Sequence, residues 1–304
     1  MTSLKKPRYA YRDRPLSRAL EPFAYLAPFL AAIAVFTLYP VINVVLMSFK
    51  EGYQMLTGRF DQVGVANYAY VLNDRYFMNA LQNTAIYVAV VVPLSTVLSI
   101  LIANLLNRRV KGMALFQTAY FMPMVTSVTA AGLAWKFMFS RDFGVINQIL
   151  SWFGVGKINW LQAPEWSLWA LIIYGVWSIL PFTIILMLSG LQNIDETYYT
   201  AARVDGAKSG RIFMRITVPM LAPTIGLVLT INTISTSKVF NEIFPLFNGR
   251  PGPSYNLYTV VYYIYDQFYV KWKLGRAAAA AMILFVIIFA ITMLQQIIQR
   301  KWSH

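Results

Sequence analysis

The sequence has no cysteine, a single histidine and little charge. The absence of cysteine excludes disulfide frameworks, thiolate catalysis and cysteine-ligated zinc or iron–sulfur centres. The one histidine is the last residue, His304, where an imidazole is usually solvated, so neither a metal site nor a catalytic residue is predicted. Asp, Glu, Lys and Arg make up 12% of the 304 residues, against about 25% in a soluble domain. A single soluble domain is therefore excluded.

The few charges leave six runs of more than 20 residues without any. These runs are 22–49, 76–107, 112–135, 166–194, 216–237 and 277–299, and the next longest is 251–265. Because an apolar helix needs about 20 residues to cross a bilayer, the distribution predicts an all-α, polytopic membrane protein with six transmembrane helices. A tail over residues 1–21 precedes the six-helix domain, which takes up residues 22–304.

The net charge of +14 indicates topology rather than a nucleic-acid partner. The first 18 residues hold one acid and six basic residues, which are Lys5, Lys6, Arg8, Arg12, Arg14 and Arg18. Basic residues before the first span favour a cytoplasmic amino terminus. The first apolar run is too long for a cleaved signal peptide, so we expect a retained helix. The expected location is the cell (inner or plasma) membrane, with a basic cytoplasmic tail.

The predicted spans lack the groups that would power transport. None contains Asp, Glu, Lys or Arg, which disfavours a proton-driven mechanism inside this chain. Sodium coupling through carbonyls and hydroxyls stays open. The segment nearest to a phosphate-binding loop, residues 202–209, has alanine at both glycine positions. We therefore expect the chain to be no enzyme and any nucleotide to be hydrolysed by another chain.

The loop between the fourth and fifth runs predicts a helix–turn–helix at the inner membrane face. Asp195 can cap a short helix, Gly206 suits a left-handed helix end, and Ser209 can cap the next turn. One face of the first helix is small and mostly apolar, with Tyr198, Ala201, Ala202 and Val204. From the residues alone, a loop that packs on its own helices and an element that docks on a partner are equally compatible with this pattern.

The same loop carries a family motif. Ala201-Ala202, Asp205-Gly206-Ala207, Ile216 and Pro219 resemble the EAA motif of permease subunits of binding-protein-dependent ABC importers, in the carbohydrate-uptake class that includes maltose and glycerol-3-phosphate permeases. Further segments resemble the same family: 64–68, 80–84, Phe143-Gly144, Asn147, Trp177, Pro181-Phe182 and Leu191-Gln192. Thr200 stands where the motif has Glu, and Val218 replaces its Leu. The large extracytoplasmic insertion of some maltose permeases is absent.

The resemblance implies a type I ABC importer permease fold and a non-catalytic subunit. Its implied partners are a second related permease, a cytoplasmic ATPase dimer that binds ATP and Mg, an extracytoplasmic solute-binding protein and the lipid bilayer. No cofactor would be bound by this chain. The 195–215 loop would dock on the ATPase through a set of motif positions: Thr200, Ala201, Ala202, Asp205, Gly206, Ala207, Ile216 and Pro219.

Polar residues in the fifth run predict part of a solute pathway. Hydroxyl and amide side chains are dense between Thr230 and Ser237. They spread over roughly 220° around a helix, so some must bond back to their own helix. The predicted pathway residues are Trp177, Asn232, Thr233, Thr236 and Phe240. For the two aromatic rings, stacking on a sugar and packing in the core are both compatible with the sequence.

The main alternative is a self-sufficient channel or secondary transporter, which would move solute without partners. A membrane scaffold is disfavoured by the hydroxyls of the fifth run. The solute itself stays open among monosaccharide, oligosaccharide, polyol and glycerol phosphate. Pairing with an identical or a different permease, and the effect of Thr200 in the motif, also stay open.

Overall fold

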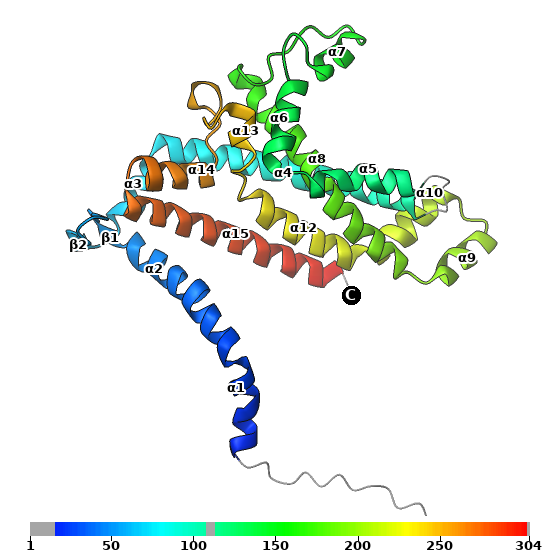
Figure 1. The fold of residues 1–304 in the computed structure, drawn as a ribbon. Coiled ribbons are helices and arrows are strands. Elements are labelled where there is room, and N and C mark those ends of the chain that lie inside the picture. Colours follow the sequence, from blue (N-terminus) through cyan, green and yellow to red (C-terminus); the bar gives the residue numbers. More distant parts are fainter. Residues whose placement is uncertain (1–15, 108–112, 303–304) are drawn as a thin grey trace, which may run out of the picture.

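The computed structural model describes residues 16–107 and 113–302, and they form a helical bundle with one small hairpin (Figure 1). The predictions for the basic tail over residues 1–15, for the inner loop around Arg108–Lys111 and for His304 concern residues outside the described ranges. The first segment runs through α1 (Leu16–Ile33), η1 (Ala34–Leu38) and α2 (Tyr39–Ser48). An antiparallel pair follows, β1 (Lys50–Glu51) with β2 (Gln62–Val63), which the sequence analysis did not predict.

The remaining elements are almost all helices. They are α3 (Ala66–Asn73), α4 (Arg75–Leu106), α5 (Met113–Val125), α6 (Val128–Met138), α7 (Val145–Ser151), α8 (Pro164–Gln192), α9 (Glu196–Val204), α10 (Ser209–Ile212), η2 (Phe213–Thr217), α11 (Val218–Met220), α12 (Ala222–Thr236), α13 (Ile243–Phe247), η3 (Pro253–Tyr255), α14 (Val260–Tyr265), η4 (Asp266–Val270) and α15 (Leu274–Trp302). The predicted all-α membrane class is confirmed, with the two-residue strands as the exception.

Four helical segments of the described chain are long and apolar enough to cross a membrane. They are Tyr25–Ser48, Arg75–Leu106, Pro164–Gln192 and Leu274–Lys301. A fifth span arises if Ser209–Met220 and Ala222–Thr236, bent by 65° at Leu221, cross together. Pro219 and Pro223 flank that bend, and each lacks the backbone N–H that an unbroken helix would use. The predicted run 112–135 is divided between α5 and α6, with a break at 126–127.

The longest helices lie side by side and form the bundle's core. α4 and α8 have the most extensive contact in the fold, and Tyr87 of α4 lies against the backbone of Gly175 in α8, where a Cβ would collide with the phenol. The alanines at the start of α15, Ala277 to Ala280, are buried, and α15 packs against α2, α12, α14 and α3. Small side chains of this kind let a neighbouring helix approach closely.

Three asparagines of the family-like segments tie the loops to this bundle. The Asn67 amide donates to the carbonyls of Ser48 and Lys50 at 3.1 and 3.0 Å. The Asn83 amide donates to the carbonyls of Asn256 and Tyr258 at 2.8 and 2.9 Å. Asn147 is buried, donates to loop carbonyls and accepts from the Trp160 indole at 3.0 Å. These residues therefore satisfy backbone groups that the loops would otherwise leave unpaired.

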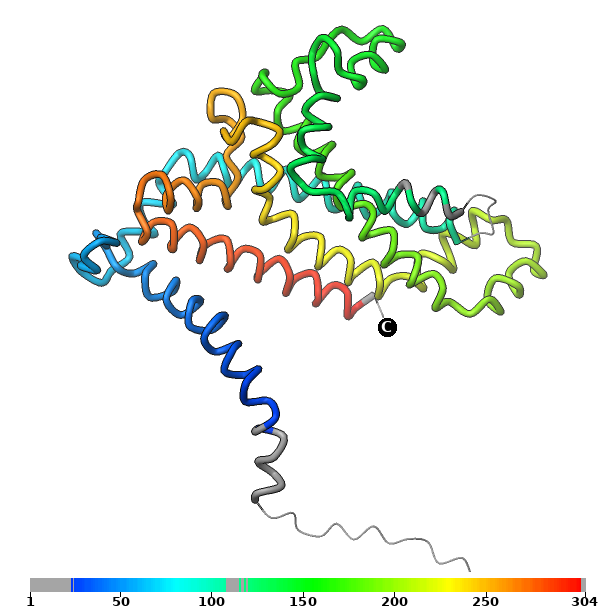
Figure 2. The backbone as a smooth tube through the Cα atoms, viewed as in Figure 1, coloured from blue at the N-terminus to red at the C-terminus, as the bar shows by residue number. Residues whose placement is uncertain are grey.

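The first span meets the bundle only at its carboxyl end, near β1, and its amino-terminal part points away from the bundle (Figure 2). No residue in its most apolar stretch is buried, whereas half of the corresponding stretch of Pro164–Gln192 is. α2 touches α15 near their common end. At the opposite end of the bundle, α9 and α10 project beyond the long helices (Figure 1).

Candidate functional site

Helix α9 begins at a well-formed amino-terminal cap. Asp195 has an extended backbone, and its Oδ1 accepts a hydrogen bond from the amide of Thr197 at 2.9 Å. That hydrogen bond lowers the pKa of the Asp195 carboxyl, because it favours the ionised form. The predicted cap is confirmed. It fixes where the chain leaves α8 and where α9 starts.

The turn after α9 depends on one glycine. Gly206 has a φ of +73°, in the left-handed region that glycine adopts without steric cost. The amide of Ala207 donates to the carbonyl of Ala202 at 2.9 Å, and the amide of Gly206 donates to that of Arg203 at 3.0 Å. The predicted helix end at Gly206 is confirmed. A Cβ at this position would meet no atom within 4 Å, so only the backbone conformation requires glycine here.

The next helix differs from the sequence prediction at its start. Ser209 is the first residue of α10, and the capping position belongs to Lys208, which makes no side-chain capping bond. The predicted Ser209 cap is therefore wrong, because the extended residue falls one position earlier than assumed. Ile216 is half-buried within η2 and Pro219 is exposed in α11, where the chain enters the bent fifth span.

The two motif alanines of α9 lie in different environments. Ala201 is exposed and lines a shallow depression together with Thr200 and Val204. Val204 is 83% exposed, so its apolar side chain has little contact with the rest of the chain. Ala202 is half-buried. Thr200, at the position of the motif glutamate, donates its hydroxyl to the carbonyl of Glu196 at 3.1 Å. Thr200, Ala201 and Val204 thus share one exposed face of α9.

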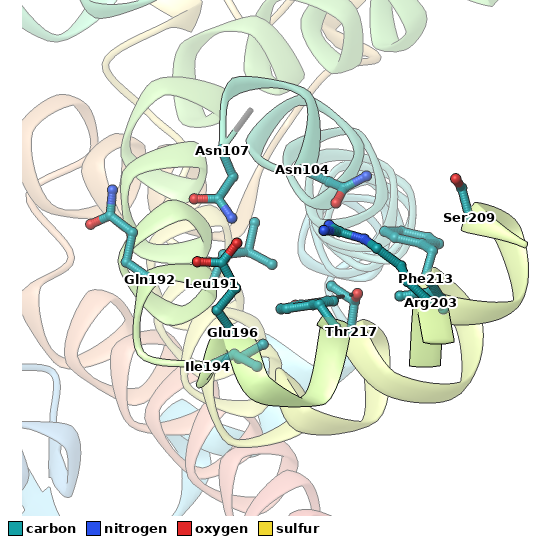
Figure 3. A pocket seen from close by; sticks show the side chains of 12 residues that line it. Asn104, Asn107, Leu191, Gln192, Ile194, Glu196, Arg203, Ser209, Phe213 and Thr217 are labelled. Carbon is teal, nitrogen blue, oxygen red and sulfur yellow. Dashed lines mark hydrogen bonds between the residues drawn. The ribbon is translucent and has the colours of Figure 1, made fainter. Parts of the chain in front are cut away.

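Behind α9 lies a polar pocket of about 580 Å³ that the sequence analysis missed. Figure 3 shows Glu196 and Arg203 of α9, Asn104 of α4 and Asn107 at its carboxyl end directed into it. The pocket separates α9 from the ends of α4 and α8, so α9 does not pack tightly on the bundle along this side. The spacing of Asn104 and Asn107, three residues apart on one helix face, is a signal that could have indicated it.

The predicted pathway residues of α12 lie in a buried polar seam. Asn232 and Thr233 are 1% and 2% exposed. The Asn232 amide donates to the hydroxyl of Thr183 in α8 at 3.1 Å, and the Gln295 amide of α15 donates to the hydroxyl of Thr233 at 2.9 Å. The polar positions of α12 therefore connect it to α8 on one side and to α15 on the other.

Other hydroxyls of this segment bond to their own helix, as predicted. Thr236 donates to the carbonyl of Asn232 at 2.7 Å, and Ser237 donates to that of Thr233 at 2.7 Å. Thr230 donates to Gly226 at 3.0 Å. Such bonds satisfy hydroxyls without a partner helix. The polar side chains of the seam therefore find their hydrogen-bond partners within this chain, either in α12 itself or in α8 and α15.

The two predicted aromatic residues each belong to a cluster of rings. Trp177 lies 5.4 Å from Trp135 and 5.8 Å from Tyr174, measured between ring centroids. Phe240 contacts another set of rings, which are Phe244, Tyr262 and Tyr265. Both residues are half-buried. Their role in solute passage stays a prediction.

The hydroxyl of Thr183 is the partner of Asn232 in this seam. The Thr183 hydroxyl donates to the carbonyl of Ile179 at 3.0 Å while it accepts from Asn232. Thr183→Val keeps the shape but leaves the Asn232 amide without its partner. We expect a loss of roughly 0.6–1.7 kcal/mol of unfolding free energy, the range for hydrogen bonds between membrane helices. Unfolding of the purified chain in mixed micelles measures it. Thr183→Ser keeps the hydroxyl and should lose less; equal losses would assign the effect to packing.

No group of three or more Asp, Glu and His side chains within residues 16–107 and 113–302 is arranged to hold a metal ion. The features that stand out are instead an exposed short helix, a glycine-dependent turn and a bent span behind them. These are the parts of the chain that match the permease motif.

Comparison with known proteins identifies the family. Residues 95–304 match the family described as binding-protein-dependent transport system inner membrane component. The chain is 34% identical over 283 residues to the arabinooligosaccharides transport system permease protein AraP of Halalkalibacterium halodurans, covering 92% of this chain and 87% of that one. It is 34% identical over 275 residues to the lactose transport system permease protein LacF of Rhizobium radiobacter, covering 89% and 91%.

A solved structure has the same fold. It is a crystal structure of a bacterial ABC transporter involved in the import of the acidic polysaccharide alginate, with a TM-score of 0.82 and 24% identity, covering 96% of this chain and all of the matched chain. The sequence matches and this shared fold agree with the three features described above, which are the exposed α9, the Gly206 turn and the bent fifth span. The chain belongs to the inner membrane components of binding-protein-dependent transport systems, as a non-catalytic permease subunit of an ABC importer.

Proposed function

We propose that this permease passes sugars or closely related solutes, driven by ATP hydrolysis on a partner. The support is the agreement among relatives whose names specify arabinooligosaccharides and lactose. The six charge-free runs also offer no internal source of energy for transport, since none of them contains Asp, Glu, Lys or Arg. Polysaccharides, oligosaccharides and smaller sugars all fit the proposal.

The observation that carries the coupling part of this proposal is the exposed surface of α9. Thr200, Ala201 and Val204 present a small, shallow face at the end of the bundle that the long helices do not cover. A face of this kind fits a groove on a second protein, and we assign that protein as the cytoplasmic ATPase dimer. The amino terminus then lies on the same, cytoplasmic side.

Movement of α9 would reach the span through a short, irregular path. η2, α11 and the 65° bend at Leu221 join α10 to α12. Bent and π-helical segments mark places where a helix can change its course. α12 carries Asn232 and Thr233, so displacement of α9 would shift the polar seam against α8 and α15. A second related permease and an extracytoplasmic solute-binding protein complete the proposed assembly.

The test is reconstitution of the whole importer in vesicles with a panel of sugars. We expect solute-stimulated ATP hydrolysis for one class of sugar, and no uptake by this chain alone. The isolated chain in liposomes is the matched control for the alternative of a self-sufficient channel. Uptake by that chain without ATPase would refute the coupling, and stimulation by amino acids or ions but no sugar would refute the solute class.

A further inference from the structure

A cleft of about 660 Å³ lies at the end of the bundle opposite α9. Its walls come from the loop between β1 and β2, from α3, and from the turn into α15. Figure 1 shows these elements together where the first and last spans meet. Neither the proposed coupling surface nor the polar seam of α12 involves this cleft.

Two cations form one wall of the cleft. Lys273 is exposed, and Arg276 is half-buried with its guanidinium carbon 3.5 Å from the centroid of the Tyr70 ring. This cation–π contact holds the guanidinium plane in place. Within the described residues, neither cation forms an ion pair; the two ion pairs found there join other residues. Lys273 and Arg276 are therefore available to an anion from outside the chain.

One carboxylate also lines the cleft, and it is already engaged. Glu51 accepts a hydrogen bond from the Gln62 amide at 2.6 Å and another from the backbone amide of Ala66 at 2.8 Å. These two hydrogen bonds lower the pKa of Glu51, which stays ionised at neutral pH. Two cations thus face one carboxylate whose oxygens are directed to other donors, and the cleft keeps a net positive charge.

The cleft lies where two apolar spans end, so we place it at the edge of the membrane's hydrocarbon region. It adjoins the end of the span Tyr25–Ser48 and the start of the span Leu274–Lys301, and most residues of both are unburied by this chain. Trp272 is 58% exposed beside it and adopts a φ of +55°, which a large side chain rarely takes. Exposed tryptophan next to lysine and arginine is typical of the headgroup region.

The β1–β2 loop adds an apolar rim. Leu56 at its tip is 97% exposed and the neighbouring Met55 is 50% exposed, although both lie beside the cleft. An apolar tip next to a basic cleft matches a ligand with a charged head and an apolar body. A soluble anion would need the cations but would leave Leu56 and Met55 in water.

From these contacts we infer that the cleft binds the headgroup of an anionic phospholipid. Lys273 and Arg276 hold the phosphate through charge-assisted hydrogen bonds, and the Met55-Leu56 tip lies along the first carbons of the acyl chains. The lipid would join the outlying first span to α15. This inference does not depend on which solute is carried or on where the ATPase docks.

The experiment titrates the purified full-length chain with phosphatidylglycerol or with phosphatidylcholine of the same acyl chains, and native mass spectrometry measures the bound lipid. We expect tighter binding of phosphatidylglycerol. The double variant Lys273→Gln, Arg276→Gln should weaken it on the order of 25-fold, from about fivefold for each juxtamembrane charge. The matched control Lys238→Gln, Arg250→Gln removes the same charges from exposed positions elsewhere and should bind like the wild type.

Three results would overturn the inference. The first is equal binding of the two lipids by the wild type. The second is unchanged phosphatidylglycerol binding in the cleft variant, even if docking of the solute-binding protein is weakened, since the cleft would then serve that protein. The third is displacement of the lipid by soluble glycerol phosphate at equal concentration, which would identify a site for free anions. A thermal unfolding midpoint equal to that of the wild type in phosphatidylcholine verifies that the variants are folded.

Discussion

Gly206→Val is expected to abolish solute-stimulated ATP hydrolysis in the reconstituted importer while leaving the chain inserted in the membrane. Gly206 has a φ of +73°, and the hydrogen bonds from the amides of Gly206 and Ala207 close the turn after α9. A side chain in this left-handed conformation costs about 1–2 kcal/mol. That cost lowers the equilibrium ratio of the native turn to other turn conformations by about 5- to 30-fold, and a displaced α9 cannot dock.

The control for this prediction lies four residues away. A Cβ added at Gly210 would likewise meet no atom within 4 Å, but the φ of Gly210 is not in the left-handed region. Gly210→Val should therefore keep most of the coupling. Gly206→Asn should recover part of it, since asparagine tolerates the left-handed backbone better than valine. Equal activity of Gly206→Val and Gly210→Val would show that the turn geometry is unimportant.

Ala201→Trp is expected to lower stimulated ATP hydrolysis at least as strongly, but by another mechanism. Ala201 is exposed in the shallow depression of α9, and an indole there would fill the space that the partner needs. The fold should be unaffected, because no internal contact is replaced. Ala290→Trp, at an exposed alanine of α15, adds the same ring outside the proposed interface and should leave hydrolysis unchanged.

The absence of cysteine gives this prediction a direct readout. In Ala201→Cys the new thiol is the only one in the chain, so maleimide labelling reports on that single position. Labelling should be fast in the free chain and protected when the ATPase is present. Ala202→Cys, at the half-buried neighbour, should label slowly in both states. Unprotected labelling of Ala201→Cys in a coupled, active complex would refute docking through this face.

Much of the fold could be predicted because its signals are local. Charge-free runs fixed the membrane class, since the desolvation of a charge in hydrocarbon dominates every weaker preference. The cap at Asp195 and the turn at Gly206 could be predicted because each depends on hydrogen bonds or backbone angles within a few residues. The Ser209 cap failed by one position, which is the usual uncertainty of a helix boundary.

The environment of each helix face could not be predicted in the same way. The seam joins Asn232 to Thr183 and Thr233 to Gln295, pairs that lie 49 and 62 residues apart in the chain. Residue spacing identifies a polar set on a helix, but it does not say which neighbouring helix receives it. For the same reason, the sequence could not show that Ala201 is exposed and that Ala202 is half-buried.

The sequence by itself determined that this chain spans the membrane, that its six long apolar runs contain no Asp, Glu, Lys or Arg, and that a capped helix and a glycine turn lie between two of them. Only the tertiary structure decided that Thr200, Ala201 and Val204 share one exposed face of α9, that a polar pocket lies behind the helix, and that Lys273 and Arg276 share a cleft with the β1–β2 loop. The physical reason is the distance along the chain over which the interactions act. Helix formation and membrane insertion depend on residues close in sequence, whereas a pocket or a cleft depends on which distant segments pack together.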